Sequence, residues 1–311
     1  MNASDGYSAE EKMTEKENVE APACLGPEPR PNPVSFTMPK GAWDTHFHVF
    51  GPTNRFPYAR KRKYTPPDAP LENYLRLMEE LGIERGVCVH PNLHGSDNSV
   101  TFDAVERSDG RFLAIVKVDR EITLAELREM KRKGTCGVRF AFNPEHGSGE
   151  LDTELFDRVV AWCEDLDLCV NLHFAAEALK GLAESLSRLR LPTIIDHFAR
   201  IDTCKGVDQP EFTMLLDLMK LPHIWMKATG ADRITKVGAP YEDVLPFAQA
   251  LVKTAPDRII WGTDWPHSGI FDRRRMPNDG DLANFLSVFA PTDELRQKIL
   301  VDNPQRLFQQ S

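Results

Sequence analysis

The sequence lacks the features of several common protein classes. Its six cysteines include no CxxC pair, and no apolar run approaches the roughly 20 residues that cross a bilayer. The first residues show neither the basic nor the apolar region of a signal peptide. Lys and Arg number 38 against 47 Asp and Glu, so the net charge of −9 disfavours a broad basic surface. We therefore expect a cytoplasmic protein with reduced cysteines that binds neither nucleic acid nor membranes.

Two parts of the chain differ in composition. Residues 1–38 are rich in Glu, Pro, Ser and Asn and show no hydrophobic period, which predicts a flexible or surface-draped arm without a catalytic role. Residues 39–311 alternate short apolar runs with amphipathic stretches. With 41% hydrophobic residues, the chain is long enough to bury one large core, and we expect this part to form a single domain.

The short apolar runs predict eight β-strands. They are Ala42–His46, Gly86–His90, Phe112–Val116, Gly137–Phe140, Cys169–His173, Thr193–His197, Ile224–Ala228 and Ile259–Thr263.

Amphipathic stretches between these runs have apolar residues at i, i+3 and i+4 and predict helices. Examples are Leu71–Leu81, Leu124–Lys133, Leu155–Leu166, Ala176–Leu189, Phe212–Leu221 and Val244–Thr254. Strands that alternate with helices indicate parallel βα units. A doubly wound sheet usually carries a GxGxxG turn after its first strand, and this chain has none. The pattern therefore favours a closed (β/α)8 TIM-type barrel.

In such a barrel the chemistry lies at the C-terminal ends of the strands. Nearly every predicted strand ends in an ionisable or metal-ligating group. The groups are His46, His48, His90, His94, Lys117, Asp119, Arg139, His173, Asp196, His197, Lys227, Asp264 and His267. A single histidine at a strand end is more often structural than functional, but so many at one rim predict an active site.

His46 and His48 are two residues apart, so on a strand both imidazoles point to the same side. They can converge on one metal ion, one substrate oxygen or one proton. Asp264 follows the last predicted strand and can complete that site, although the same position would also suit a helix N-cap.

Three motifs resemble signatures of the amidohydrolase superfamily. They are Asp44-Thr45-His46-Phe47-His48, Ile195-Asp196-His197-Phe198-Ala199-Arg200 and Trp261-Gly262-Thr263-Asp264-Trp265-Pro266-His267. Within that superfamily the chain resembles the branch of the 2-pyrone-4,6-dicarboxylate lactonases and 4-sulfomuconolactone hydrolases, over about Lys40 to Phe308. Further similarity lies in His94-Gly95-Ser96-Asp97-Asn98, Gly137-Val138-Arg139-Phe140, Lys227-Ala228-Thr229 and Asp232-Arg233.

The resemblance implies a lactone hydrolase with an assigned set of residues. Asp264 would act as general base for water, and His46, His48 and His197 would polarise the ring carbonyl, directly or through a metal. Arg139, Arg200 and Arg233 would bind acidic groups of the substrate, with His94 and Lys227 as further binding candidates.

The cofactor is left open between none and a single divalent metal of the zinc type. The superfamily's ligand set corresponds here to His46, His48, His173, His197 and Asp264. The pyrone-dicarboxylate lactonases act without a divalent metal and have a tyrosine where this chain has His173. A histidine at that position could again serve as a metal ligand.

The substrate is predicted to be a small anionic lactone from the breakdown of an aromatic acid. This chain lacks a basic residue a few positions beyond Arg139, where Asn143-Pro144-Glu145-His146 stands. That difference favours 4-sulfomuconolactone, hydrolysed to maleylacetate and sulfite, over pyrone dicarboxylate. The run Asp272-Arg273-Arg274-Arg275 is a secondary anion-binding candidate, or a solvated loop. The motifs are also compatible with a sugar-lactone hydrolase or isomerase, a metal-dependent decarboxylase, or a non-enzymatic sensor of an acidic metabolite.

Overall fold

Eight parallel strands form one sheet in the order β1 to β8. The structure is a computed structural model that describes residues 21–143 and 150–308. The strands are β1 (Trp43–Phe47), β2 (Arg85–Val89), β3 (Phe112–Val116), β4 (Thr135–Ala141), β5 (Cys169–His173), β6 (Thr193–Ile195), β7 (Ile224–Lys227) and β8 (Ile259–Ile260). All eight predicted strands are present, and β2, β6, β7 and β8 end one or more residues earlier than predicted.

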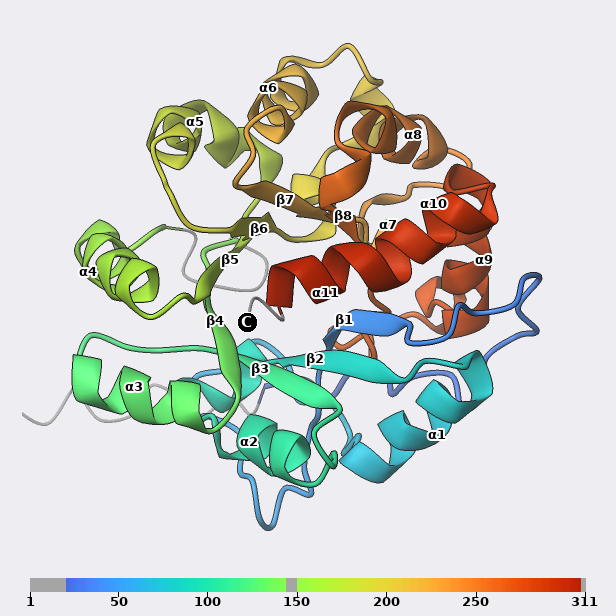
Figure 1. Ribbon diagram of the computed structural model, residues 1–311. Coiled ribbons are helices and arrows are strands. Elements are labelled where there is room, and N and C mark those ends of the chain that lie inside the picture. The colour runs from blue at the N-terminus through green and yellow to red at the C-terminus, as the bar shows by residue number, and fades with distance from the viewer. Residues whose placement is uncertain (1–20, 144–149, 309–311) are drawn as a thin grey trace, which may run out of the picture.

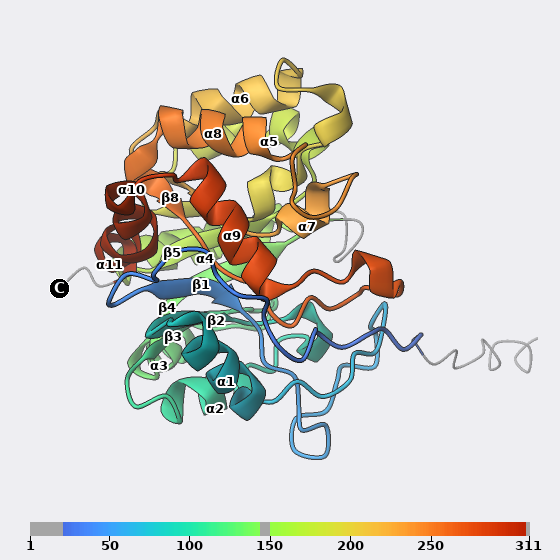
Figure 2. The same cartoon turned by 90° about the vertical axis from the view of Figure 1, so that its right-hand side faces the viewer.

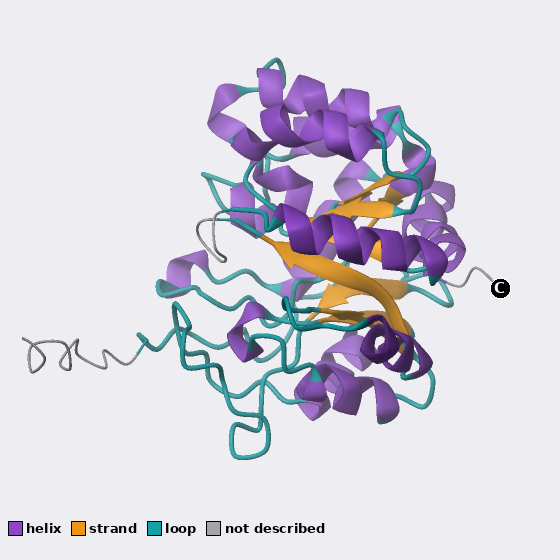
Figure 3. Cartoon of the chain, turned by 90° about the vertical axis from the view of Figure 1, so that its left-hand side faces the viewer, coloured by secondary structure: helices purple, strands orange, loops and turns teal. Residues whose placement is uncertain are grey.

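Backbone hydrogen bonds between the first strand and the segment after the last one close the barrel. Thr45 N–H donates to Trp261 O at 3.0 Å, Asp264 N–H donates to His46 O at 2.8 Å, and His48 N–H donates to Trp265 O at 2.8 Å. Strands therefore lie at the centre, with helices around them (Figures 1 and 3). The predicted (β/α)8 TIM-type barrel is confirmed.

The helices alternate with the strands along the chain. They are α1 (Leu71–Leu81), α2 (Ser99–Glu106), α3 (Leu124–Arg132), α4 (Thr153–Asp165), α5 (Leu179–Ser187), α6 (Pro210–Met219), α7 (Ala231–Ile234), α8 (Leu245–Thr254), α9 (Asp279–Phe289), α10 (Asp293–Gln297) and α11 (Asn303–Phe308). The six predicted helices correspond to α1, α3, α4, α5, α6 and α8. No helix in the described part of the chain is both long and apolar enough to cross a membrane.

Local sequence signals define several helix ends. Thr123 caps α3 in a capping box with Glu126, and the Asp152 side chain accepts a hydrogen bond from Leu155 N–H at the start of α4. Pro210 occupies the first turn of α6, where its missing N–H has no helical partner. Gly82 ends α1 at a φ of 74°, a left-handed conformation that glycine adopts without strain.

The barrel interior has an apolar lower layer. One buried cluster collects inward-facing strand residues together with a residue of α11, the last helix. Its members are Trp43, Val87, Val89, Ile115, Cys169, Ile194, Trp225, Ile260 and Leu307. Polar and charged strand residues such as His46, Asn171 and Lys227 are also fully buried, so they form a second layer on the C-terminal side. Figure 2 shows that the long loops gather at the end toward which β1 points.

The described part of the predicted arm, residues 21–38, packs along the loops at that end of the barrel. Cys24 N–H donates to Thr65 O at 3.0 Å, and Leu25 N–H donates to Ile270 O at 2.8 Å. Asn32 N–H donates to Asn278 Oδ1 at 2.6 Å, at the start of α9. Residues 1–20 of the arm lie outside the described residues.

Candidate active site

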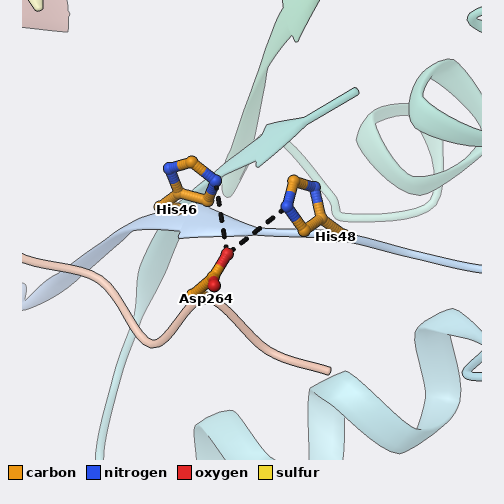
Figure 4. Close-up of side chains that lie close together, drawn as sticks. All are labelled: His46, His48 and Asp264. Carbon is orange, nitrogen blue, oxygen red and sulfur yellow. Dashed lines mark ion pairs between the residues drawn. The ribbon is translucent and has the colours of Figure 1, made fainter. Parts of the chain in front are cut away.

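Strand β1 brings His46 and His48 to the same side, where both face Asp264 (Figure 4). The Nε2 atoms of both histidines lie 3.5 Å from Asp264 Oδ1. All three side chains are buried. The i, i+2 spacing and the residue after the last strand therefore meet as the sequence predicts.

Asp44 fixes the position of Asp264 relative to the two histidines. Its carboxylate accepts hydrogen bonds from His46 N–H at 2.9 Å and from the N–H and hydroxyl of Thr263 at 3.0 and 2.6 Å. Gly262 is required at this junction, since a Cβ there would lie 2.5 Å from His46 N. The Gly-Thr-Asp segment thus joins β1 closely enough to aim Asp264 at the histidines.

His197 reaches the same point from a left-handed turn after β6. The turn spans His197–Arg200, whose φ values lie between 51° and 55°. Four consecutive non-glycine residues in this region are costly, and such strain is characteristic of functional sites. The turn places His197 Nε2 3.9 Å from Asp264 Oδ1.

The ring orientations fit a cation between these groups. His48 Nδ1 lies 2.6 Å from Val89 O, and His197 Nδ1 lies 3.3 Å from Thr229 O, so each Nδ1 donates its hydrogen to a carbonyl. The Nε2 of each ring then points toward the Asp264 carboxylate, and in a neutral ring of this tautomer that atom carries a lone pair. Lone pairs from two imidazoles and one carboxylate suit one divalent metal, and metal-bound histidines usually donate their other ring N–H to a carbonyl in this way.

Ligand atoms of His46, His48 and Asp264 lie within 4.8 Å of one another, as do those of His46, Asp196 and His197. His173, the fifth predicted ligand, belongs to neither group, although its ring centroid lies 5.3 Å from that of His197. Burial lowers the pKa of His197 to about 4, against the opposing effect of the Asp264 and Asp196 charges. The ring is therefore neutral at physiological pH and available as a ligand or hydrogen-bond partner.

A fully buried polar network lies beneath His46. Lys227 Nζ lies 3.2 Å from His46 Nδ1, 3.0 Å from Asn171 Oδ1 and 3.3 Å from Asp196 Oδ1. Asp196 also accepts from Asn171 Nδ2 at 2.7 Å and pairs with Arg139 Nη2 at 3.2 Å. Burial alone would raise the pKa of Asp196, but the Lys227 charge and the other partners hold it well below the usual carboxyl value.

Arg233 pairs with the predicted base. Its Nε and Nη2 lie 2.9 and 2.8 Å from Asp264 Oδ2, and its Nη1 donates to Ser268 O at 3.1 Å. Burial by itself would raise the pKa of Asp264, yet the Arg233 charge and then the neighbouring histidines hold that pKa well below its usual range. Arg233 thus holds Asp264 and also lines the pocket, and its binding of substrate acids stays a prediction.

A pocket of about 430 Å³ opens above these groups. Seven residues of the predicted site line it, namely His48, Arg139, His173, His197, Arg200, Arg233 and Asp264. His46 lies below it, fully buried. The two remaining candidates do not line it: Lys227 lies in the network beneath, and the buried His94 ring packs beside Tyr58 with Nδ1 3.1 Å from Pro57 O.

The Asp272–Arg275 run lies outside this pocket. Arg273 pairs with Glu28 of the N-terminal segment at 3.0 Å, and Arg274 pairs with Asp272 at 2.7 Å. Both arginine side chains are exposed. Their contacts match those of a solvated loop.

Several residues of the site carry no predicted role. They are Asp196 and Asn171 beneath it, and Lys61, Arg62, Lys63, Tyr64, Asn92, Lys117 and Ser268 on the pocket wall. Asp196 and Lys117 stand at predicted strand ends, which is the signal that marks them. Residues 61–64 come from a long loop after β1, and nothing in their local pattern indicates that they reach the site.

Comparisons with known proteins agree with this architecture. The family model described as Amidohydrolase matches residues 43–310. The 4-sulfomuconolactone hydrolase of Hydrogenophaga intermedia is 66% identical over 96% of this chain and 98% of its own length. The 2-pyrone-4,6-dicarboxylate hydrolase of Comamonas testosteroni is 39% identical over 89% of this chain and 93% of its own.

A solved structure is also similar. The apo crystal structure of an Agrobacterium tumefaciens protein superposes with a TM-score of 0.78 at 30% identity, covering 90% of this chain and 99% of that one. The chain therefore belongs to the amidohydrolase family, in the branch of the 4-sulfomuconolactone and 2-pyrone-4,6-dicarboxylate hydrolases.

Proposed function

We propose that this protein is a lactonase that hydrolyses 4-sulfomuconolactone to maleylacetate and sulfite. The observation that carries the proposal is the 66% identity, over nearly the full length of both chains, to a 4-sulfomuconolactone hydrolase. A second protein of that name, from Rhizobium radiobacter, is 63% identical over 92% of this chain. The pocket supports an anionic substrate, since seven of its lining side chains are Lys or Arg and one is a carboxylate.

Asp264 takes the role of general base. Its low pKa keeps the carboxylate ionised at neutral pH, and it faces the pocket beside His48 and His197. Asp264 accepts a proton from water as that water attacks the lactone carbonyl. Returning the proton to the ring oxygen breaks the carbon–oxygen bond and opens the ring.

Ring opening accounts for the release of sulfite. Carbon 4 of the substrate bears both the ring oxygen and the sulfo group, so opening leaves a hydroxyl and a sulfonate on one carbon. Loss of the hydroxyl proton forms the ketone of maleylacetate, and the carbon–sulfur electron pair leaves with sulfite. Water supplies the oxygen of the new carboxylate, and the overall reaction needs no oxidant.

The site also suits a single divalent metal of the zinc type. Nε2 of His46, His48 and His197 with Oδ1 of Asp264 would hold it. When bound, such an ion supplies Lewis acidity toward the lactone carbonyl. The roles of Asp264 as base and of the arginines toward the substrate anions are the same in its presence.

A substrate panel tests the function. Purified protein would be assayed with 4-sulfomuconolactone, 2-pyrone-4,6-dicarboxylate and D-galactarolactone, following loss of the lactone and release of sulfite. We expect the highest kcat/KM with 4-sulfomuconolactone and one sulfite for each ring opened. A higher kcat/KM with pyrone dicarboxylate would contradict the proposal, as would isomerisation of the sugar lactone without hydrolysis.

A further inference from the structure

The pocket wall contains a lysine to which the reaction scheme assigns no role. Lys117 directly follows β3 and lines the pocket beside Arg139. Its Nζ donates to Asn92 Oδ1 at 3.0 Å, which is a neutral amide oxygen. Within residues 21–143 and 150–308, no carboxylate pairs with this ammonium group. The positive charge of Lys117 therefore faces the pocket without a counter-ion from the described residues.

Lys117 is held rigidly for a long side chain. The buried Asn98 amide contacts both of its backbone polar groups, accepting from Lys117 N–H at 2.9 Å and donating to Lys117 O at 2.8 Å. With the backbone fixed by Asn98 and the tip fixed by Asn92, little side-chain entropy remains to be lost on binding. Such preorganisation is typical of a binding group rather than of a solvated surface lysine.

The electrostatics of this wall favour an anion. Burial lowers the pKa of Lys117, and the nearby positive charge of Arg139 lowers it further. Arg139 has one pairing with Asp196, and Arg233 is engaged with Asp264. A bound anion would relieve the repulsion between Lys117 and Arg139 and would replace lost hydration of the ammonium group.

We propose that Lys117 forms the sulfonate subsite of the pocket and thereby selects the sulfonated lactone; this rests on the proposed function. A lysine ammonium group is a compact charge with three donors, of which Asn92 uses one. The remaining two can meet the oxygens of a three-oxygen sulfonate in many orientations. An arginine fork instead matches a planar carboxylate, which suits Arg200 on the same pocket for the carboxylate of the substrate.

Binding measurements separate this role from general electrostatics. The protein carrying Asp264→Asn would be titrated calorimetrically with 4-sulfomuconolactone and with its desulfo analogue muconolactone, in which hydrogen replaces the sulfo group. Adding Lys117→Met should weaken binding of the sulfonated lactone by about tenfold or more, the usual loss for a charged hydrogen bond. The same change should alter the Kd of muconolactone by less than about threefold.

Two further variants sharpen the test. Lys253→Met, on the exposed face of α8, removes the same charge far from the pocket and should leave both Kd values unchanged. Asn92→Asp keeps Lys117 in place but pairs its ammonium with a carboxylate, so it should weaken sulfonate binding much as Lys117→Met does. Far-UV circular dichroism and thermal melting would establish that each variant is folded, and Asn92→Asp carries the test if Lys117→Met does not fold.

The outcomes distinguish the subsite from the function. Equal losses for both lactones, or no loss for either, would overturn the sulfonate subsite even if the protein hydrolyses 4-sulfomuconolactone. Lys117-dependent binding of the sulfonated lactone without turnover by the unsubstituted protein would support the subsite and contradict the proposed function. Failure of the Asp264→Asn protein to bind either lactone would overturn the subsite.

Discussion

Arg233 holds Asp264 through two nitrogens on one carboxylate oxygen, with Nε at 2.9 Å and Nη2 at 2.8 Å from Oδ2. The other oxygen, Oδ1, faces the three histidines. Arg233 therefore fixes Oδ2 of the carboxylate, and Oδ1 is left to face the histidines and the substrate. This division explains how a side chain on α7, outside the strand ends, controls the predicted base.

Arg233→Met should shift the pH dependence of kcat/KM. The pKa of Asp264 rises with burial and is held down chiefly by Arg233. Without that positive charge the folded-state pKa moves up, so the acid limb of the profile moves to higher pH. We also expect kcat/KM at neutral pH to fall by about 10²-fold, because the base is no longer held in place.

Arg233→Lys is the matched control for this prediction. It keeps a positive charge beside Asp264 but loses the two-nitrogen contact, so its acid limb should stay nearer to that of the unsubstituted protein while kcat falls. An acid limb that does not move in Arg233→Met would show that another group sets the profile.

The pair His267 and Asp279 should make stability depend on pH. Burial would lower the pKa of His267, but the Asp279 carboxylate, 3.0 Å from Nε2, outweighs it and raises the pKa above 6.5. The pair therefore contributes its full stability below about pH 6.5 and loses it as pH rises through the folded-state pKa.

Asp279→Asn removes the negative charge of this pair. Urea unfolding should show a loss of about 1–3 kcal/mol near pH 5.5 and a smaller loss near pH 9. A loss that is the same at both pH values would mean that the carboxylate acts without charging His267. The variant keeps Asn278, the N-cap of α9, so the cap contributes equally to the unfolding free energy of both proteins and does not affect the difference.

The histidine and aspartate cluster should bind one divalent metal. Chelator-treated protein would be titrated with Zn²⁺ against a chromophoric competitor, which measures binding without any assay of activity. We expect one ion per chain, and a loss of affinity in His48→Ala beyond the roughly 10–100-fold that follows from changing a residue that only supports a ligand. His223→Asn, at a histidine outside the cluster, should keep the affinity. Failure of the unsubstituted protein to bind Zn²⁺ would contradict this ligand set.

The alternation of strands and helices could be predicted because both faces of a parallel sheet are buried, which makes its strands continuous apolar runs. Two helices that the sequence pattern hides, and one strand that is shorter than predicted, illustrate the limits. Helix α2 buries only Val100, Thr101 and Ala104, too few to give a clear helical period. Helix α9 buries residues around most of its circumference, including Gly280 and Asp279. Strand β8 has only two residues because the chain turns immediately to bring Asp264 toward β1.

The meeting of His46, His48, His197 and Asp264 could be predicted from their positions at strand ends. The depth of a side chain in the barrel could not be predicted in this way. Lys227 also stands at a strand end, yet its side chain points into the buried network beneath the pocket. The pairing of Arg233 with Asp264 could not be predicted either, because it depends on how α7 packs against the turn after β8. The position of a residue in the sequence predicts at which end of the barrel it lies, whereas the direction of its side chain depends on packing.

The role of Asp264 is tested most directly by measuring the sulfite that the unsubstituted protein and Asp264→Asn release from 4-sulfomuconolactone. If Asp264 is the base that activates water, the variant should remain folded and release sulfite about 10²–10⁴-fold more slowly. Release by Asp264→Asn within about threefold of the unsubstituted rate would contradict this role, because removal of a general base typically costs about 10²–10⁴-fold in rate.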